Sequence, residues 1–277
     1  MTDAVVARKM HRTLEPFHGF VYFAPEAHEA YAALGLTDRQ MGYFASRAAP
    51  MGAVSAEVVI AAFFNFSPDL VRRAIPAAWA IAAPARVHEA RLAAVDGVLR
   101  KVLVAEVTSP DLGEAAELAR RAADACRPEG RPLFAAHAAL ERPDEAHLQL
   151  WLAVTQLREF RGDGHIACLV DQELSGCEAL VLHDATGEIP PGALRSTRAR
   201  TDAEWAEATE RLRARGWLDG DGALTEEGRS ARLEIEARTD ELAMAPWRAL
   251  GDDACTRLRT LVRPWSRSLV ASGTFGG

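Results

Sequence analysis

The sequence contains no apolar run close to the roughly 20 residues that a membrane helix requires. Its first residues, MTDAVVARKMHR, lack the long apolar stretch of a signal peptide. β-Branched and aromatic residues rarely alternate with polar ones, so only short strands are expected. These absences predict a cytoplasmic protein that is mainly α-helical and contacts no membrane.

Cysteine is scarce and the charge balance is negative. The four cysteines form no CxxC pair, so neither a disulfide framework nor structural zinc is expected. With 32 Lys and Arg against 39 Asp and Glu, the formal net charge of -7 provides no overall attraction for DNA. Any contact with nucleic acid would therefore need a local basic patch.

Alanine, leucine, arginine and glutamate dominate the 277 residues, a length that suits one large or two smaller domains. The turn Arg127-Pro128-Glu129-Gly130 is the expected boundary between two lobes. We therefore predict a helical N-terminal lobe over residues 1–130 and a second lobe over residues 131–277.

Prolines and glycines predict two helix breaks that bear on a functional site. Pro16 is expected to separate two helices, because proline disfavours the helical conformation of the residue before it. Gly162 is expected to end a helix, and Asp163 to cap the one that follows.

The C-terminal third follows the order helix, hairpin, helix. Trp205, Ala208, Thr209 and Leu212 have the spacing of one buried helix face. Residues 217–225 contain Asp-Gly turn chemistry and predict a β-hairpin, after which another helix begins. This order is that of a winged helix.

Two resemblances follow from these segments. The run LRARGWLDGDGALTEEG, residues 212–228, resembles the wing pattern of MarR-type regulators, and residues 146–240 fit that plan. The whole chain is similar to an actinobacterial family of helix-turn-helix proteins. The segments that carry this likeness are Glu15-Pro16-x-His18, Tyr22-Phe23-Ala24-Pro25-Glu26, Tyr43-Phe44-Ala45-x-Arg47-Ala48-Ala49-Pro50, Leu157-Arg158-Glu159-x-Arg161-Gly162-Asp163-Gly164-His165 and Glu178-Ala179-Leu180-Val181-Leu182-His183.

The resemblance implies a MarR-like winged helix in the C-terminal lobe and no particular activity. The N-terminal lobe could be a degenerate winged helix, so that one chain would imitate a two-subunit regulator. Phe160 stands where the family usually has histidine, and Cys177 where it usually has an apolar or small residue.

The sequence of the expected recognition helix weighs against DNA. Its N-terminal half, where base contacts are usually made, carries Asp202, Glu204, Glu207 and Glu210. The wing Asp219-Gly220-Asp221-Gly222 is acidic too and would repel phosphate. We therefore place duplex DNA behind a small molecule as partner. The DNA alternative would use arginines of the basic loop and the recognition helix: Arg195, Arg198, Arg200, Arg211, Arg213 and Arg215.

Two clusters of polar residues are candidates for chemistry. His11, Glu15 and His18 have the spacing of one helix face, but the expected break at Pro16 weakens a metal site, and none is predicted. Arg158, Arg161 and His165 continue the apolar stripe that contains Val154. Charges on an inward face need partners, so an ion-paired network between the lobes explains this pattern as well as a pocket does.

If a pocket exists, its residues can be assigned by type. His165 and His18 are the proton-transfer candidates, because imidazole titrates near pH 7. Arginines would hold an anionic group, carboxylates would orient a histidine or compensate an arginine, and tyrosines would form an apolar wall. These residues are Arg47, Arg158, Arg161, Glu15, Glu26, Asp163, Tyr22 and Tyr43.

The sequence thus predicts a protein that binds a small anionic or aromatic molecule between two lobes. Catalysis is left open, because no Ser-His-Asp order, phosphate loop, HExxH or dinucleotide motif occurs and no cofactor can be named. The alternative is a MarR-like regulator that binds duplex DNA. The assembly is expected to be a monomeric pseudo-dimer or a homodimer.

Overall fold

The computed structural model describes residues 4–190 and 192–275, and the regular elements in this part of the chain are helices, as predicted. The first half contains the α-helices α1 (Val5–Gly19), α2 (Pro25–Ala33), α3 (Arg39–Ala48), α4 (Ala56–Phe63), α5 (Pro68–Ala74), α6 (Ala77–Ile81), α7 (Pro84–Leu103), α8 (Pro110–Asp124) and α9 (Pro132–Ala138). The second half contains α10 (Ala146–Asp171), α11 (Gly176–Asp184), α12 (Ala193–Thr197), α13 (Asp202–Ala214), α14 (Glu226–Leu242), α15 (Ala245–Leu250) and α16 (Asp252–Ala271). The 3₁₀ turns are η1 (Phe20–Tyr22), η2 (Ala49–Met51) and η3 (Val104–Thr108).

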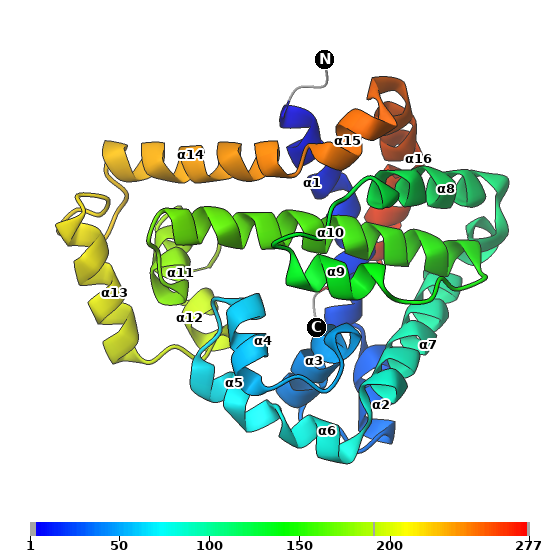
Figure 1. Cartoon of the computed structure of the whole chain (residues 1–277), viewed down its shortest axis with the longest axis horizontal. Helices are drawn as coiled ribbons and strands as arrows, with labels where there is room; N and C mark the ends of the chain where they lie inside the picture. The colour runs from blue at the N-terminus through cyan, green and yellow to red at the C-terminus, as the bar shows by residue number, and fades with distance from the viewer. Residues whose placement is uncertain (1–3, 191, 276–277) are drawn as a thin grey trace.

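Helix α10 is the centre of the arrangement. Figure 1 shows it crossing the middle of the molecule, with α14 along one side and α9 along the other, and it packs against both. It also packs against α1, α7 and α8. One helix therefore touches elements from both ends of the chain. None of the described helices is long and apolar enough to cross a membrane.

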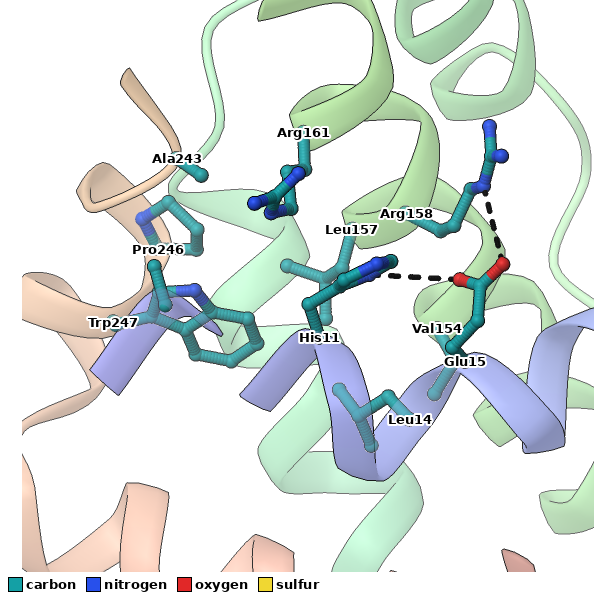
Figure 2. Close-up of a pocket in the computed structure, with 11 residues that line it drawn as sticks. His11, Leu14, Glu15, Val154, Leu157, Arg158, Arg161, Ala243, Pro246 and Trp247 are labelled. Carbon is teal, nitrogen blue, oxygen red and sulfur yellow. Dashed lines mark ion pairs between the residues drawn. The ribbon is translucent and has the colours of Figure 1, made fainter. Parts of the chain in front are cut away.

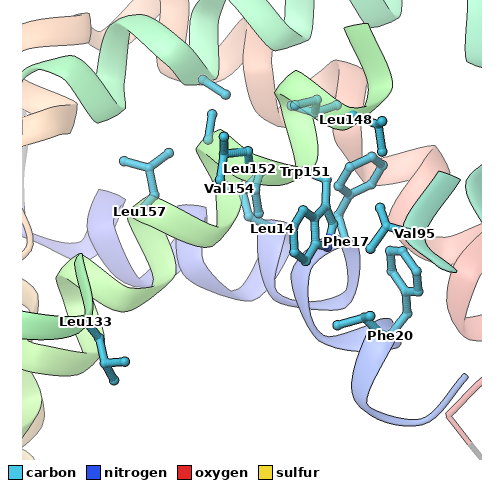
Figure 3. Close-up of a cluster of buried hydrophobic side chains, with 14 of the residues drawn as sticks. Leu14, Phe17, Phe20, Val95, Leu133, Leu148, Trp151, Leu152, Val154 and Leu157 are labelled. Atoms are coloured by element: carbon cyan, nitrogen blue, oxygen red, sulfur yellow. The ribbon is translucent and has the colours of Figure 1, made fainter. Parts of the chain in front are cut away.

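The larger hydrophobic core forms where α1, α7 and α10 meet. Leu14 and Phe17 of α1 lie against the fully buried Trp151 of α10, with Val95 of α7 beside them (Figure 3). This cluster takes residues from both sides of residue 130, and on α10 it reaches Leu157. The expected lobe boundary at residue 130 stays a prediction.

A smaller core holds the C-terminal helices together. It begins at Cys168 near the end of α10 and includes Ala208 and Leu212 of α13. Both α13 residues are fully buried, in agreement with the helix face read from the sequence. The boundary between the two clusters therefore lies within α10. Residues 158–167 of α10 belong to neither cluster, so polar side chains can stand there without disrupting a hydrophobic core.

The expected helix break at Pro16 is wrong. Helix α1 continues through Pro16, which removes one backbone hydrogen bond near the helix end. Leu14 and Phe17, on either side of it, are almost completely buried. Burying two such side chains yields about 3–6 kcal/mol, enough to offset a proline cost of roughly 3 kcal/mol.

The break expected at Gly162 is wrong as well, since α10 runs without interruption from Ala146 to Asp171. The glycines in this stretch make room for a neighbouring side chain. A Cβ on Gly164 would lie 2.6 Å from the Arg131 guanidinium, which donates to the Phe160 carbonyl and covers the Phe160 ring. Asp163 accepts a hydrogen bond from the Phe134 amide of α9, so it caps that helix and not a new one.

The predicted wing is shorter than a β-hairpin. Leu218 and Leu224 form a single antiparallel bridge, and no strand is present among the described residues. The Asp219 amide donates to the Ala223 carbonyl over 2.9 Å, which closes the turn. The Thr225 amide donates to the Trp217 carbonyl over 3.1 Å on the other side of the bridge, so the pairing is limited to these few residues within the connection 215–225 between α13 and α14.

Candidate functional site

Two adjoining cavities lie where α1, α3, α10 and the segment after α12 meet. The larger has a volume of about 850 Å³ and the deeper one about 250 Å³. Five residues line both cavities, namely Tyr43, Arg47, Phe66, Arg158 and Arg198. The larger volume is within the range of small-molecule sites.

A buried carboxylate holds two arginines at the point where the cavities join. Arg47 of α3 donates to both oxygens of Glu159, from Nε over 3.1 Å and from Nη2 over 2.9 Å. Arg158 donates to the same carboxylate over 3.0 Å. Burial alone would raise the pKa of Glu159, but Arg47 and Arg158 hold it well below its usual range. Arg158 also pairs with Glu15 over 3.7 Å, whereas Arg47 depends on Glu159 alone among the described carboxylates.

Arg198 is the third guanidinium at this point, and it has no carboxylate partner among the described residues. Within the described part of the chain its only side-chain hydrogen bond goes to Thr197 Oγ1, and its buried Nε has no partner there. Burial lowers the pKa of Arg198, and the nearby Arg47 and Arg158 act in the same direction. An anion in the cavity would satisfy this N–H group and balance the excess positive charge.

The backbone around Arg198 is fixed to the N-terminal half of the chain. The Ser67 amide donates to the Arg198 carbonyl over 2.9 Å. Arg200 donates to the Asn65 and Phe66 carbonyls in the turn between α4 and α5. The segment that follows α12 is therefore a wall of the cavity rather than a free basic loop.

Aromatic rings form the rest of this wall. Tyr43 of α3 contacts Tyr22 and Phe66, with ring centroids 5.2 Å and 5.6 Å away. The Arg198 guanidinium lies 4.8 Å from the centre of the Phe66 ring. Aromatic rings beside a guanidinium group favour a flat, unsaturated ligand.

His165 of α10 lines the deeper cavity. Its Nδ1 lies 2.9 Å from Thr239 Oγ1, and that hydroxyl already donates to the Ile235 carbonyl. Nδ1 must therefore carry the proton, which leaves Nε2 as an acceptor. Burial lowers the pKa of His165 to about 4, so the ring is neutral at pH 7.

The structure brings together some of the residues that the sequence singled out. Glu15, Tyr22, Tyr43, Arg47 and Arg158 line the larger cavity. The predicted role of these residues as ligand contacts stays a prediction. Arg198 entered the sequence analysis only as a DNA contact, and the basic run 195–200 gave no sign that the Arg198 carbonyl is bonded to Ser67 and the Arg200 side chain to Phe66.

Other predicted site residues lie elsewhere. His18 is fully buried behind Tyr22 and lies 3.0 Å from Thr155 Oγ1 through its Nδ1. Glu26 pairs with Lys101 at the surface, outside both cavities. The carboxylate of Asp163 caps α9, as described above, and burial raises its pKa to about 6.

Arg161 lines a third cavity of about 20 Å³, room for a single water molecule. It pairs with Asp240 over 2.9 Å and with Glu236 over 3.3 Å, both on α14. In the same cavity the Glu15 carboxylate lies between His11 and Arg158 (Figure 2). Arg161 therefore links α10 to α14, two helices that both follow residue 130, and not the two predicted lobes to each other.

The arrangement does not favour a metal. Although α1 is continuous, His11 faces Glu15 while His18 is held by Thr155. Within residues 4–190 and 192–275, no three His, Cys, Asp or Glu side chains are grouped so that they could hold a metal ion.

The arginines on the expected DNA-binding face are engaged in contacts of their own. Arg211 pairs with Glu178 and Glu207. Arg213 pairs with Glu210 and donates to two carbonyls of the wing. Arg195 pairs with Asp202, Arg200 with Glu204, and Arg215 donates to the Gln172 carbonyl. Phosphate would have to compete with these internal partners.

Comparison with known proteins gives one match. The model of a family described as a helix-turn-helix family matches residues 7–276. No curated protein and no solved structure match the chain.

Proposed function

The chain belongs to this helix-turn-helix family. For this family member we propose that a small aromatic anion binds in the two adjoining cavities beside α3 and α10. The observation that carries the proposal is Arg198. Arg198 is half-buried and has no carboxylate partner among the described residues, and its buried Nε donates to no acceptor, which is costly unless a ligand accepts that hydrogen bond.

The charge and shape of the cavities support this ligand class. Arg47, Arg158 and Arg198 converge at the junction, and the two carboxylates paired with them, Glu159 and Glu15, compensate only part of their charge. Tyr43 and Phe66 supply flat apolar surfaces on the same side. A carboxylate or similar anion would bind the guanidinium groups in a charge-assisted, bidentate way, while an aromatic ring would lie against the rings.

His165 gives the ligand a second polar contact. Its neutral ring offers Nε2 as an acceptor in the deeper cavity. A ligand with an anionic group at one end and a hydroxyl or N–H group at the other would satisfy Arg198 and His165 together. In this proposal His165 binds and orients, and no reaction is assigned to it.

The test is ligand-dependent stabilisation. We expect benzoate, hydroxybenzoate and naphthoate to raise the melting temperature of the protein in proportion to the logarithm of their concentration, and benzamide to have little effect. Arg198→Ala should weaken the carboxylates by about 10- to 100-fold, since a charge-assisted hydrogen bond contributes about 1.5–3 kcal/mol. The changes are measured by thermal shift and by calorimetric titration.

Arg195→Ala is the matched control. Arg195 lies on α12, three residues from Arg198, but it pairs with Asp202 at the surface and lines neither cavity. Its removal should leave the affinity for aromatic carboxylates unchanged. Equal losses in the two variants, or no stabilisation by any aromatic anion, would contradict the proposal.

Membership of the family supports a second candidate, a regulator that binds duplex DNA through α13 and the wing. If that face binds phosphate, Arg211→Ala with Arg213→Ala should reduce the salt dependence of duplex binding by about two phosphate contacts. Because both arginines are paired internally, we expect the double variant to change duplex affinity by less than about threefold. Fluorescence anisotropy with a labelled duplex measures this difference, and a larger loss would favour the DNA alternative.

A further inference from the structure

A basic groove runs between the first and last long helices of the chain. Helices α1 and α16 pack side by side, and a groove of about 490 Å³ lies along their joint surface. Its lining residues include five cations, Lys9, Arg12, Arg259, Arg263 and Arg267. None of the residues that line it is acidic or aromatic.

These five cations have no carboxylate partner in the part of the chain that the structure describes. Among residues 4–190 and 192–275, no carboxylate lies within ion-pair distance of any of them. Four are exposed and one, Arg259, is half-buried. On a chain with a net charge of -7, the groove is a local concentration of positive charge.

The spacing of the charges follows the helices. Arg259, Arg263 and Arg267 recur at every fourth residue, so they stand roughly 6 Å apart along one side of α16. Lys9 and Arg12 stand on the facing side of α1. The result is two rows of cations that follow a line, as the negative charges of a phosphodiester backbone do.

Other groups in the groove offer little for specific recognition. Ser266 Oγ donates to the Thr13 carbonyl, and Thr13 Oγ1 donates to the Lys9 carbonyl, so both hydroxyls are engaged. The groove has no sheet edge for an extended peptide and no aromatic ring on which an unpaired base could stack. Recognition by charge alone suits the backbone of a nucleic acid duplex better than an acidic peptide.

We propose that the groove between α1 and α16 binds the phosphate backbone of duplex nucleic acid, without base specificity. This site lies on a different surface from α13 and the wing, and it does not depend on a ligand in the cavities. Arginine forks bind phosphate oxygens in bidentate fashion, and four of the five cations are arginines.

The experiment is a salt titration with a fluorescein-labelled duplex of about three helical turns. Binding of the full chain is followed by anisotropy at KCl concentrations between about 50 and 200 mM. Five phosphate contacts give an expected slope of log affinity against log salt of about -4.5. The variant Arg263→Glu with Arg267→Glu should bind at least about tenfold more weakly, and the magnitude of its slope should be smaller by about 2.

Arg73→Glu with Arg248→Glu is the matched control, because both residues are exposed, lie outside the groove and change the net charge equally. It should bind as the unchanged protein does. Arg12→Gln with Arg267→Gln, one residue from each helix, is a milder variant for use if the charge reversal impairs folding, as judged by circular dichroism. It should reduce the magnitude of the slope by about 2 as well.

Three results would overturn the proposal. The groove and control variants could lose affinity equally, which would indicate a general effect of net charge. Duplex binding could be lost in Arg213→Glu and kept in the groove variants, which would place it on the helix-turn-helix face. The unchanged protein could fail to bind duplex at the lowest salt while binding polyglutamate, which would make the occupant an acidic protein.

Discussion

Glu159→Gln is expected to lower the free energy of unfolding by about 3–5 kcal/mol, because it leaves the buried Arg47 guanidinium without a counterion. Glu159 is completely buried and accepts hydrogen bonds from Arg47 and Arg158. Glutamine keeps the shape of the side chain but brings two N–H donors toward two guanidiniums. Urea unfolding at pH 7 measures the change, and the melting temperature should fall by roughly 10 °C.

Two further variants show whether charge is the cause. Glu57→Gln removes an exposed carboxylate that pairs with Arg72, and it should change stability by less than about 1 kcal/mol. The double variant Arg47→Met with Glu159→Gln should lose less stability than the two single variants lose together. The reason is that Arg47, which Glu159→Gln leaves unpaired, is removed as well. If Glu159→Gln were as stable as the unchanged protein, the interpretation of this cluster as a buried ion network would be wrong.

Acidification from pH 7 to pH 5 is expected to destabilise the fold well before the exposed carboxylates titrate. His137 is buried, and burial lowers its pKa to about 4 from the ordinary value of 6.5. Burial also lowers the pKa of His18 well below that value. A histidine with a lowered pKa stabilises the fold above pH 6.5, and this contribution is lost as the pH falls toward 4. At pH 5 the loss from His137 is about 2 kcal/mol.

Asp163 acts in the opposite direction. Burial raises its pKa to about 6 from 3.8, so its contribution is present at low pH and is lost as the pH rises through 6. Between pH 7 and pH 5 it offsets about 1 kcal/mol of the histidine effect. The buried histidines are more numerous, so the net change is destabilising.

Urea unfolding at pH 7, 6 and 5 tests the acid effect. In His137→Leu the decrease between pH 7 and pH 5 should be smaller by about 2 kcal/mol, because the titrating group is gone. His28→Leu is the control, since His28 is half-buried, faces Arg39 and lies outside the core. A stability that stays constant down to pH 5, or an unchanged pH profile in His137→Leu, would contradict the assignment of His137 as a neutral buried group.

The candidate site shows how far residue types lead before the fold is known. Polar residues on an apolar stripe correctly pointed to a buried ionic cluster around Arg158, because buried charge needs partners wherever it occurs. The same pattern could not separate Arg158, which lines the large cavity, from Arg161, which locks α10 to α14. The two arginines are three residues apart on α10, so their side chains face different neighbouring helices. Only these neighbours decide the role of each arginine.

The sequence by itself determined the helical class, the face of α13 that is buried, and the presence of paired charges inside the molecule, because these follow from local propensity, periodicity and the cost of burying charge. It did not determine where helices end at Pro16 and Gly162, because burial of Leu14 and Phe17 and the approach of Arg131 to Gly164 outweigh the local preference. It also did not place Arg198 beside Arg47 and Arg158. That meeting depends on hydrogen bonds between residues more than a hundred positions apart, from the Ser67 amide to the Arg198 carbonyl and from the Arg200 side chain to the Asn65 carbonyl, and tertiary packing alone decides such contacts.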